Sequence, residues 1–125
     1  MTELTTKLVV RSADDALDYY SRAFGAVAGP QHRDGGTVLH AQMTLFGVRV
    51  SLKDGDDTDP APGDSGKAGV IMEVTTDDPD SVADRAVAAG GTLVFPVEDR
   101  EYGARAGRVR DPLGHEWIVS SPVSG

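Results

Sequence analysis

The chain has 125 residues, which is the size of a single domain, and its formal net charge of −8 argues against nucleic acid as a partner. It contains no cysteine, which excludes disulfides, thiolate metal sites and thiol nucleophiles. Its apolar runs are about one strand long and its first residues lack the features of a signal peptide, so we expect a cytoplasmic protein with no membrane partner. The acidic charge is compatible with a cationic ligand, but solubility explains it more simply.

The first part of the chain predicts a strand, a capped helix and a second strand. Residues 7–10 form the first strand, and Ser12 opens the helix as its N-cap, with Asp15 three residues later. Gly25 ends the helix. Residues 26–32 indicate a second strand, although a Gly-Pro pair interrupts the pattern. The apolar face of the helix consists of Ala13, Ala16, Leu17, Tyr20 and Phe24.

Residues 37–53 give the clearest sheet signal, because two alternating runs flank a turn at Phe46-Gly47. In a two-residue hairpin Leu45 pairs with Val48 and Gln42 pairs with Ser51, so that the apolar and polar sets occupy opposite faces. The apolar set, expected to face the helix, is Leu39, Ala41, Met43, Leu45, Val48, Val50 and Leu52. The polar set is His40, Gln42, Thr44, Arg49, Ser51 and Lys53.

Residues 54–66 are rich in Asp, Pro and Gly and predict a flexible loop. The loop begins like a calcium-binding loop, but Asp59 and Ser65 stand where that motif requires glycine and glutamate. The run 63–66 (GDSG) matches the nucleophile motif of chymotrypsin-like proteases, but the chain is too short for that fold. Neither match is therefore taken as a functional site.

The second part of the chain repeats the order of the first. Residues 69–74 predict a strand, Asp78-Pro79 begins a helix as N-cap and N1, and Gly90-Gly91 ends it. Residues 92–97 predict the next strand. The apolar face of this helix consists of Val82, Ala83, Ala86, Val87 and Ala89.

The last segment predicts two strands, residues 105–110 and 115–119, joined by the turn Asp111-Pro112-Leu113-Gly114. Proline fixes φ, aspartate can bond its own backbone, and glycine tolerates positive φ. Alternation places Trp117 and Val119 on the helix-facing side, with Trp117 in the core. Glu116 and Ile118 fall on the opposite side.

The repeated order indicates an internal duplication, in which Leu17, Gly25 and Gly47 correspond to Val82, Gly90 and Gly114. We expect one α+β domain over residues 1–125, with a first βαβββ module at about 5–54, the acidic loop at 54–67 and a second module at about 68–121. Two curved mixed sheets with their helices outside would leave a cleft lined by the polar side chains.

The run YGARAGRVRDPLGHEWIV, together with LVVRSADDALDYYSRAFGA near the start, resembles the vicinal oxygen chelate superfamily. That superfamily includes glyoxalases, bleomycin-resistance proteins and extradiol dioxygenases. The nearest branch is similar to bleomycin-resistance-like or 3-demethylubiquinone methyltransferase-like proteins. The resemblance implies the duplicated fold, and it implies a homodimer in which both chains complete each cleft.

In metal-dependent members of that superfamily, four strands supply His or Glu ligands. The resemblance places those positions at Thr5, Ser51, Gly69 and Ile118, none of which is a histidine or a carboxylate. A two-residue slip would recruit only Glu116. We therefore predict no metal and no other cofactor, which disfavours glyoxalase and dioxygenase activity, because both need the ion as a Lewis acid.

The predicted ligand-binding residues come from both modules, and each has a structural alternative. His40 could simply bond Gln42, Arg49 could be solvated, and Tyr102 and Arg105 could hold a loop in place. Glu73 could be a buried base or a charge at the rim. The full predicted set is His40, Gln42, Arg49, Ser51, Glu73, Tyr102 and Arg105.

Three functions remain open at this point. The leading hypothesis is a metal-free protein that binds a small molecule and could sequester a toxic or antibiotic compound. The alternative is a lyase, isomerase or dioxygenase of the same fold, using a metal or acid–base chemistry through Glu73 or His40. The third is an interaction module with an empty cleft.

Overall fold

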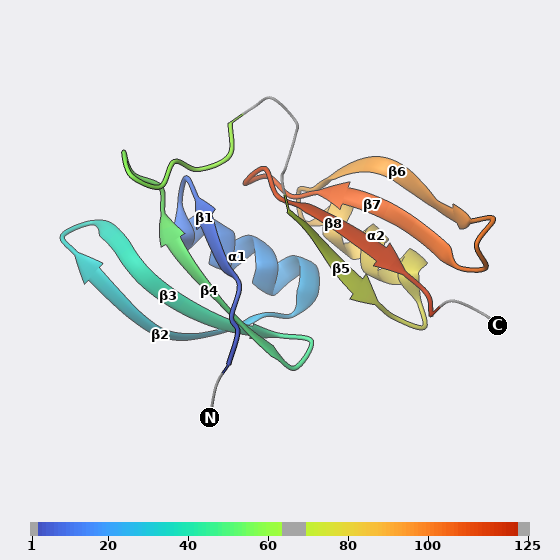
Figure 1. Cartoon of the computed structure of the whole chain (residues 1–125), viewed down its shortest axis with the longest axis horizontal. Coiled ribbons are helices and arrows are strands. Elements are labelled where there is room, and N and C mark those ends of the chain that lie inside the picture. The colour runs from blue at the N-terminus through green and yellow to red at the C-terminus, as the bar shows by residue number, and fades with distance from the viewer. Residues whose placement is uncertain (1–2, 64–69, 123–125) are drawn as a thin grey trace. The chain divides into compact units, whose positions relative to one another are not determined.

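A computed structural model describes residues 3–63 and 70–122 of the chain. The chain divides into two compact units, residues 1–63 and 64–125, and each unit has one helix and one four-stranded mixed sheet (Figure 1). The α+β class and the two βαβββ modules are therefore confirmed, with each helix packed on one face of its own sheet. Neither helix within the described ranges is long and apolar enough to cross a membrane.

The first unit has the sheet order β1-β4-β3-β2, in which β1 and β4 are parallel and the other neighbours are antiparallel. Strands β1 and β2 are therefore its edges. The elements are β1 (Lys7–Val10), α1 (Ala13–Phe24), β2 (Val27–Asp34), β3 (Thr37–Leu45) and β4 (Val48–Asp54).

Helix α1 begins and ends where its capping residues predict. The Ser12 hydroxyl oxygen accepts a hydrogen bond from the Asp15 amide at 3.2 Å, and Gly25 ends the helix with φ of 72°. The predicted apolar face is buried except for Leu17, which is half-buried. Tyr19 and Ala23 are buried as well, so the apolar face is broader than predicted.

The hairpin of β3 and β4 has the predicted register, with Leu45 opposite Val48 and Gln42 opposite Ser51. Its turn has two left-handed residues, Phe46 with φ of 51° and Gly47 with φ of 76°, as a two-residue turn that matches the twist of the strands requires. The Phe46 ring packs 5.7 Å from the Phe24 ring between centroids. This contact favours an aromatic residue at a position where glycine or asparagine is usual.

Two residues assigned to the apolar, helix-facing side of this hairpin are exposed instead of buried. Leu39 is 42% exposed, and Val38 is buried in its place, because the register of β2 and β3 shifts between His32 and Arg33 and gives β3 an extra residue. Val48 is exposed because it lies at the tip of the hairpin.

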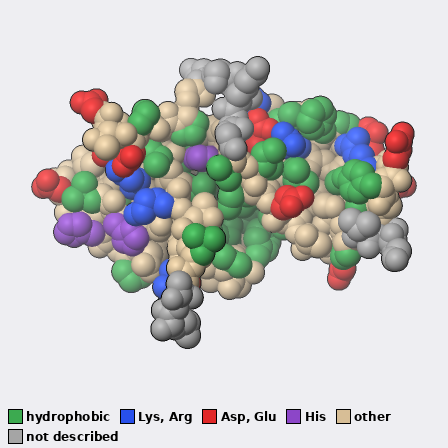
Figure 2. Space-filling model, viewed as in Figure 1, with side chains coloured by type: hydrophobic (Ala, Val, Ile, Leu, Met, Phe, Trp, Pro, Cys, Tyr) green, Lys and Arg blue, Asp and Glu red, His purple; other side chains and the backbone are tan. Residues whose placement is uncertain are grey.

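Strand β2 forms an exposed edge of the first sheet and runs longer than the predicted residues 26–32. The Gly-Pro pair does not end it, but the register shifts between Ala28 and Gln31 around that pair. Proline has no amide hydrogen and cannot donate to a neighbouring strand. Beyond this shift His32 pairs with His40, and Figure 2 shows histidine side chains gathered over β2 and β3.

Asp54 joins the start of α1 to the start of β3. Its two carboxylate oxygens accept hydrogen bonds from the Ala13 amide at 2.7 Å and the Val38 amide at 2.8 Å. Asp54→Ala should lower the free energy of unfolding by about 1–3 kcal/mol, because two part-buried donors lose their acceptor. Urea unfolding measures this loss. The matched control is Asp57→Ala in the adjoining loop, expected within about 0.5 kcal/mol of the parent, and equal losses in the two variants would contradict the assignment.

The second unit repeats the first with the order β5-β8-β7-β6, in which β5 and β8 are parallel. The strand predicted at residues 69–74 begins at Ile71, and Gly69 lies outside the described residues. The elements are β5 (Ile71–Thr75), α2 (Pro79–Ala88), β6 (Thr92–Asp99), β7 (Arg105–Arg110) and β8 (Glu116–Ser120).

Helix α2 starts as predicted, because an Asp78 carboxylate oxygen accepts a hydrogen bond from the Ser81 amide at 3.2 Å and Pro79 follows as the first helical residue. Ala83 and Ala86 are buried, whereas Val87 is 39% exposed. The helix therefore packs through small side chains. The glycines that mark the duplication, at positions 25, 47, 90 and 114, all have positive φ.

The turn between β7 and β8 is organised by the buried side chain of Asp111. Its Oδ1 accepts from the Leu113 amide at 2.9 Å and the His115 amide at 3.0 Å. Its Oδ2 accepts from the indole Nε1 of Trp117 at 2.9 Å. Trp117 is 2% exposed, so its predicted place in the core is confirmed.

Candidate functional site

The strand register of the second unit gives its sheet a helix-facing side and an open side. Val109 pairs with Trp117 on the helix-facing side. On the open side, Arg108 pairs with Ile118 and Arg110 pairs with Glu116. The faces predicted for β8 are therefore confirmed, and two arginines of β7 lie beside Glu116 and Ile118.

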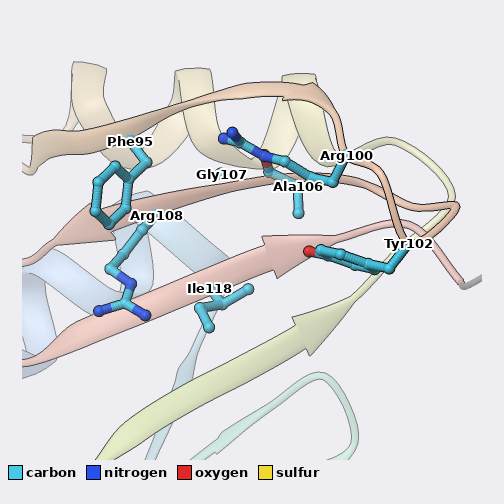
Figure 3. A pocket seen from close by; sticks show the side chains of 7 residues that line it. All are labelled: Phe95, Arg100, Tyr102, Ala106, Gly107, Arg108 and Ile118. Atoms are coloured by element: carbon cyan, nitrogen blue, oxygen red, sulfur yellow. The ribbon is translucent and has the colours of Figure 1, made fainter.

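A pocket of about 280 Å³ opens on this side. Figure 3 shows Phe95 and Arg108 together at one end, Tyr102 at the other, and Ile118 between them. Ala106, Gly107 and Arg100 complete the wall. The volume lies just below the range of about 300–1,000 Å³ that ligand pockets occupy, so it can hold a small molecule or one part of a larger one.

The close approach of β6 to Gly107 shapes the pocket. A side-chain Cβ at Gly107 would lie 2.8 Å from the Val97 amide nitrogen and 2.9 Å from the Phe95 carbonyl oxygen, so any larger residue would push β6 away. The register of β6 shifts between Phe95 and Glu98 at this point. The irregular strand places the Phe95 ring centroid 5.6 Å from the Arg108 guanidinium carbon, within the range of a cation–π contact.

Glu116 lies between two guanidinium groups on the same open side of the sheet. Arg108 Nη1 donates to its Oε1 at 3.1 Å, and Arg110 Nη2 donates to its Oε2 at 3.0 Å. The Glu116 side chain is only 6% exposed. Burial pushes the pKa of Glu116 up, but the hydrogen bonds from Arg110 and Arg108 outweigh it and leave that pKa below its ordinary value. Glu116 is therefore a carboxylate at neutral pH.

The loop between β6 and β7 holds Tyr102 at the rim. Arg100 Nε donates to the Ala106 carbonyl oxygen at 2.9 Å, and the Arg100 amide donates to the Ala104 carbonyl oxygen at 2.8 Å. These bonds fix the loop to the start of β7. Tyr102 is exposed and borders the pocket, which is a position from which its ring can contact a ligand.

The other two predicted residues of the second unit lie apart from the pocket. Glu73 is exposed on β5, paired with Ile118 on the open side. Arg105 lies on the helix-facing side, where its Nε donates to Asp80 of α2 at 2.7 Å and its Nη1 lies 3.4 Å from Asp99. The hydrogen bond between Arg105 and Asp80 raises the pKa of Arg105 and lowers that of Asp80. These contacts agree with the alternative in which Arg105 holds the loop in place.

The four predicted residues of the first unit share the polar face of its sheet. His40 Nδ1 lies 2.8 Å from Lys7 Nζ, and His40 Nε2 lies 3.3 Å from Gln42 Nε2. Arg49 pairs at the surface with Glu3 at 3.5 Å. Ser51 is buried between its register partners Lys7 and Gln42. Their role in ligand binding stays a prediction.

Within residues 3–63 and 70–122, no three His, Asp or Glu side chains come close enough to hold a metal ion. Thr5 is exposed, Ser51 is buried and Ile118 lines the pocket, while Gly69 and Ser65 lie outside the described residues. Two aspartates of the loop that resembles a calcium site, Asp56 and Asp59, instead accept hydrogen bonds from Lys53 Nζ. The absence of a metal and of any other cofactor stays a prediction.

The sequence interpretation missed Phe95, Arg108 and Arg110 and considered Glu116 only as a metal ligand. A usable signal was present in the alternation, because Arg108 and Arg110 alternate with Val109 and so fall on the same face as Glu116 and Ile118. Counting outward from the predicted turn at residues 111–114 pairs Arg110 with His115, one residue away from its observed partner Glu116. Phe95 had no such signal, since its position depends on the register shift in β6.

Comparison with known proteins agrees with this architecture. The model of the Glyoxalase/Bleomycin resistance protein/Dioxygenase superfamily matches residues 4–119. A protein of Mycobacterium tuberculosis is 35% identical over 130 residues, which is 96% of this chain and 74% of that protein. The structure of TioX from Micromonospora sp. ML1 has a TM-score of 0.76 and 26% identity over 97% of this chain and 98% of that one. An Arabidopsis thaliana gene product has a TM-score of 0.77 and 30% identity over 96% and 98%. The chain therefore belongs to the glyoxalase/bleomycin resistance protein/dioxygenase superfamily.

Proposed function

We propose that the protein binds a small molecule without the help of a metal, and that the ligand occupies the pocket on the open side of the second sheet. The pocket itself is the observation that supports this most strongly. It combines the rings of Phe95 and Tyr102 and the aliphatic side chain of Ile118 with the guanidinium of Arg108. Binding sites for small molecules are concave and mostly apolar, with a few polar groups that fix orientation.

Binding is better supported than acid–base catalysis. A general base or acid works best when its pKa lies near the working pH, whereas two arginines hold the pKa of Glu116 below its ordinary value. Glu73 is exposed and makes no ion pair within 4 Å to a described residue. Because the superfamily includes bleomycin-resistance proteins, sequestration of a toxic or antibiotic compound is the role that fits this binding site.

The proposal is tested by measuring thermal stability with a panel of aromatic antibiotics and small organic acids. A compound present at 100 times its dissociation constant should stabilise the fold by about 2.7 kcal/mol. Phe95→Ala should abolish that gain with little loss of stability, because Phe95 is 53% exposed. The matched control is Leu93→Ala, which removes an exposed apolar side chain from the opposite face of β6 and should leave binding intact.

Two results would contradict the proposal. One is a flat response across the whole panel, or a gain in stability that Phe95→Ala leaves unchanged. The other is one zinc, nickel, manganese or iron ion per chain in protein purified without a chelator, as measured by elemental analysis.

The proposal also includes the homodimer and the cytoplasmic location expected from the sequence. Superfamily membership supports the dimer, which sedimentation velocity would detect as twice the chain mass of 13.1 kDa. A species of single-chain mass at micromolar concentration would contradict the dimer. The proposed binding function would still stand, because the second unit forms the pocket alone.

A further inference from the structure

The charge near the pocket is opposite in sign to the charge of the whole chain. The chain has a net charge of −8. The pocket is lined by two arginines, Arg100 and Arg108, and by no carboxylate among the described residues. Arg108 also donates to the carboxylate of Glu116, which it shares with Arg110.

The local charge should determine which ligands bind. At physiological ionic strength the Debye length is about 8 Å, so exposed acidic side chains farther away are largely screened. Partly buried charges are screened less, and the Arg108 side chain is only 26% exposed. A cationic ligand, with which the overall negative charge is compatible, would therefore be repelled by the positive charge of the arginines at this pocket.

One donor near the pocket also lacks an acceptor. Arg108 uses Nη1 for Glu116, while its Nε is buried and has no hydrogen-bond partner among the described residues. A buried donor in this state is costly unless a water, an ion or a ligand supplies the acceptor. The Phe95 ring stacks on the same guanidinium, so an acceptor at Arg108 would lie beside an aromatic surface.

Resting on the binding function proposed above, we propose that the ligand is an organic anion with a flat aromatic body. Its carboxylate or similar oxyanion accepts hydrogen bonds from Arg108, and its ring lies between Phe95 and Tyr102 above Ile118 (Figure 3). Guanidinium groups suit this role because they are planar, always charged and able to donate to an oxyanion with two N–H groups at once.

Three probes with one ring system and different charges test this proposal. They are 2-naphthoate, 2-naphthamide and 2-naphthylmethylammonium, measured by isothermal titration calorimetry with the full chain at neutral pH. 2-Naphthoate should bind about tenfold or more tightly than the neutral amide, since a charge-assisted hydrogen bond is about twice as strong as a neutral one. The ammonium probe should bind most weakly.

Variants of Arg108 then test whether its guanidinium is responsible for the preference for 2-naphthoate over 2-naphthamide. Arg108→Gln should reduce the affinity for 2-naphthoate to that for the amide and leave the amide within about twofold. Arg108→Lys keeps the charge without the planar fork and should retain part of the preference, which provides a second test if the glutamine variant folds poorly. Arg85→Gln on α2 removes an equal charge on the helix side and should change neither affinity.

The outcomes separate this inference from the proposed function. Equal affinity for 2-naphthoate and 2-naphthamide, or an equal loss of both in Arg108→Gln, would overturn the inference and leave the binding function standing. The inference also fails, and the binding function stands, if no naphthyl probe binds while a panel compound binds in a manner that requires Phe95. If neither the probes nor the panel compounds bind, the proposed function fails together with the inference.

Discussion

Asp111→Ala is expected to lower the free energy of unfolding by about 3–5 kcal/mol, because it removes the acceptor from three hydrogen-bond donors at once. Those donors are the amides of Leu113 and His115 and the indole nitrogen of Trp117. The indole nitrogen would then be buried without a partner. Urea unfolding followed by the fluorescence of Trp117, the single tryptophan of the chain, measures both the stability and the environment of the indole.

Two matched variants separate the parts of this effect. Asp111→Asn keeps Oδ1 for the two turn amides and loses only the acceptor of the indole, so it should cost about 1–3 kcal/mol. Asp84→Ala removes an exposed carboxylate from α2 and should lie within about 0.5 kcal/mol of the parent. A loss below about 1 kcal/mol for Asp111→Ala would show that the turn does not depend on this side chain.

Glu116→Ala should destabilise the protein by about 2–4 kcal/mol, because it leaves two guanidinium groups facing each other without their shared carboxylate. The expected loss is smaller than for a fully buried pair, because the side chains of Arg108 and Arg110 are 26% and 32% exposed and water can reach them. Urea unfolding measures the decrease in the free energy of unfolding. Glu98→Ala removes an exposed carboxylate from β6 and is the control, expected within about 0.5 kcal/mol.

The pH dependence of stability distinguishes a charge effect from simple loss of packing. The folded-state pKa of Glu116 is lower than its unfolded value, so its stabilising contribution is fully present above the unfolded pKa of about 4.3 and is lost as pH falls through the folded pKa. The gap in stability between the parent and Glu116→Gln should therefore narrow below about pH 4. A gap that stays constant from about pH 7 to about pH 3 would mean that the charge of Glu116 contributes nothing.

The features that were predicted correctly depend on short stretches of sequence. Ser12 and Asp78 cap their helices because a cap needs only its own neighbouring amides. The register of residues 37–53 followed from a two-residue turn and strict alternation. Asp111 was predicted to bond its own backbone, and it does.

The features that were missed depend on a partner strand. Leu39 was assigned to the core because alternation was extended along β3, but the pairing with β2 shifts by one residue and turns Leu39 outward. Gly107 belongs to the motif that carries the resemblance to the family. The reason why this position requires glycine is visible only in the structure, where the backbone of β6 lies close beside it. Register shifts arise between strands, so the pattern within one strand does not reveal them.

The candidate site was predicted in part for the same reason. Tyr102 was selected from a motif and lines the pocket. Arg105 came from the same motif, but alternation with Val109 places it on the helix-facing side. Arg108 was overlooked because its contact with Phe95 requires the register shift in β6, which the sequence pattern does not reveal.

The outer strands β2 and β6 have a consequence for the behaviour of the protein at high concentration. Each contains a proline, Pro30 or Pro96, and the register of each shifts at that proline. A polypeptide aligned along either strand would find its ladder of main-chain hydrogen bonds interrupted. We expect these two edges to resist amyloid-like growth and strand addition between molecules.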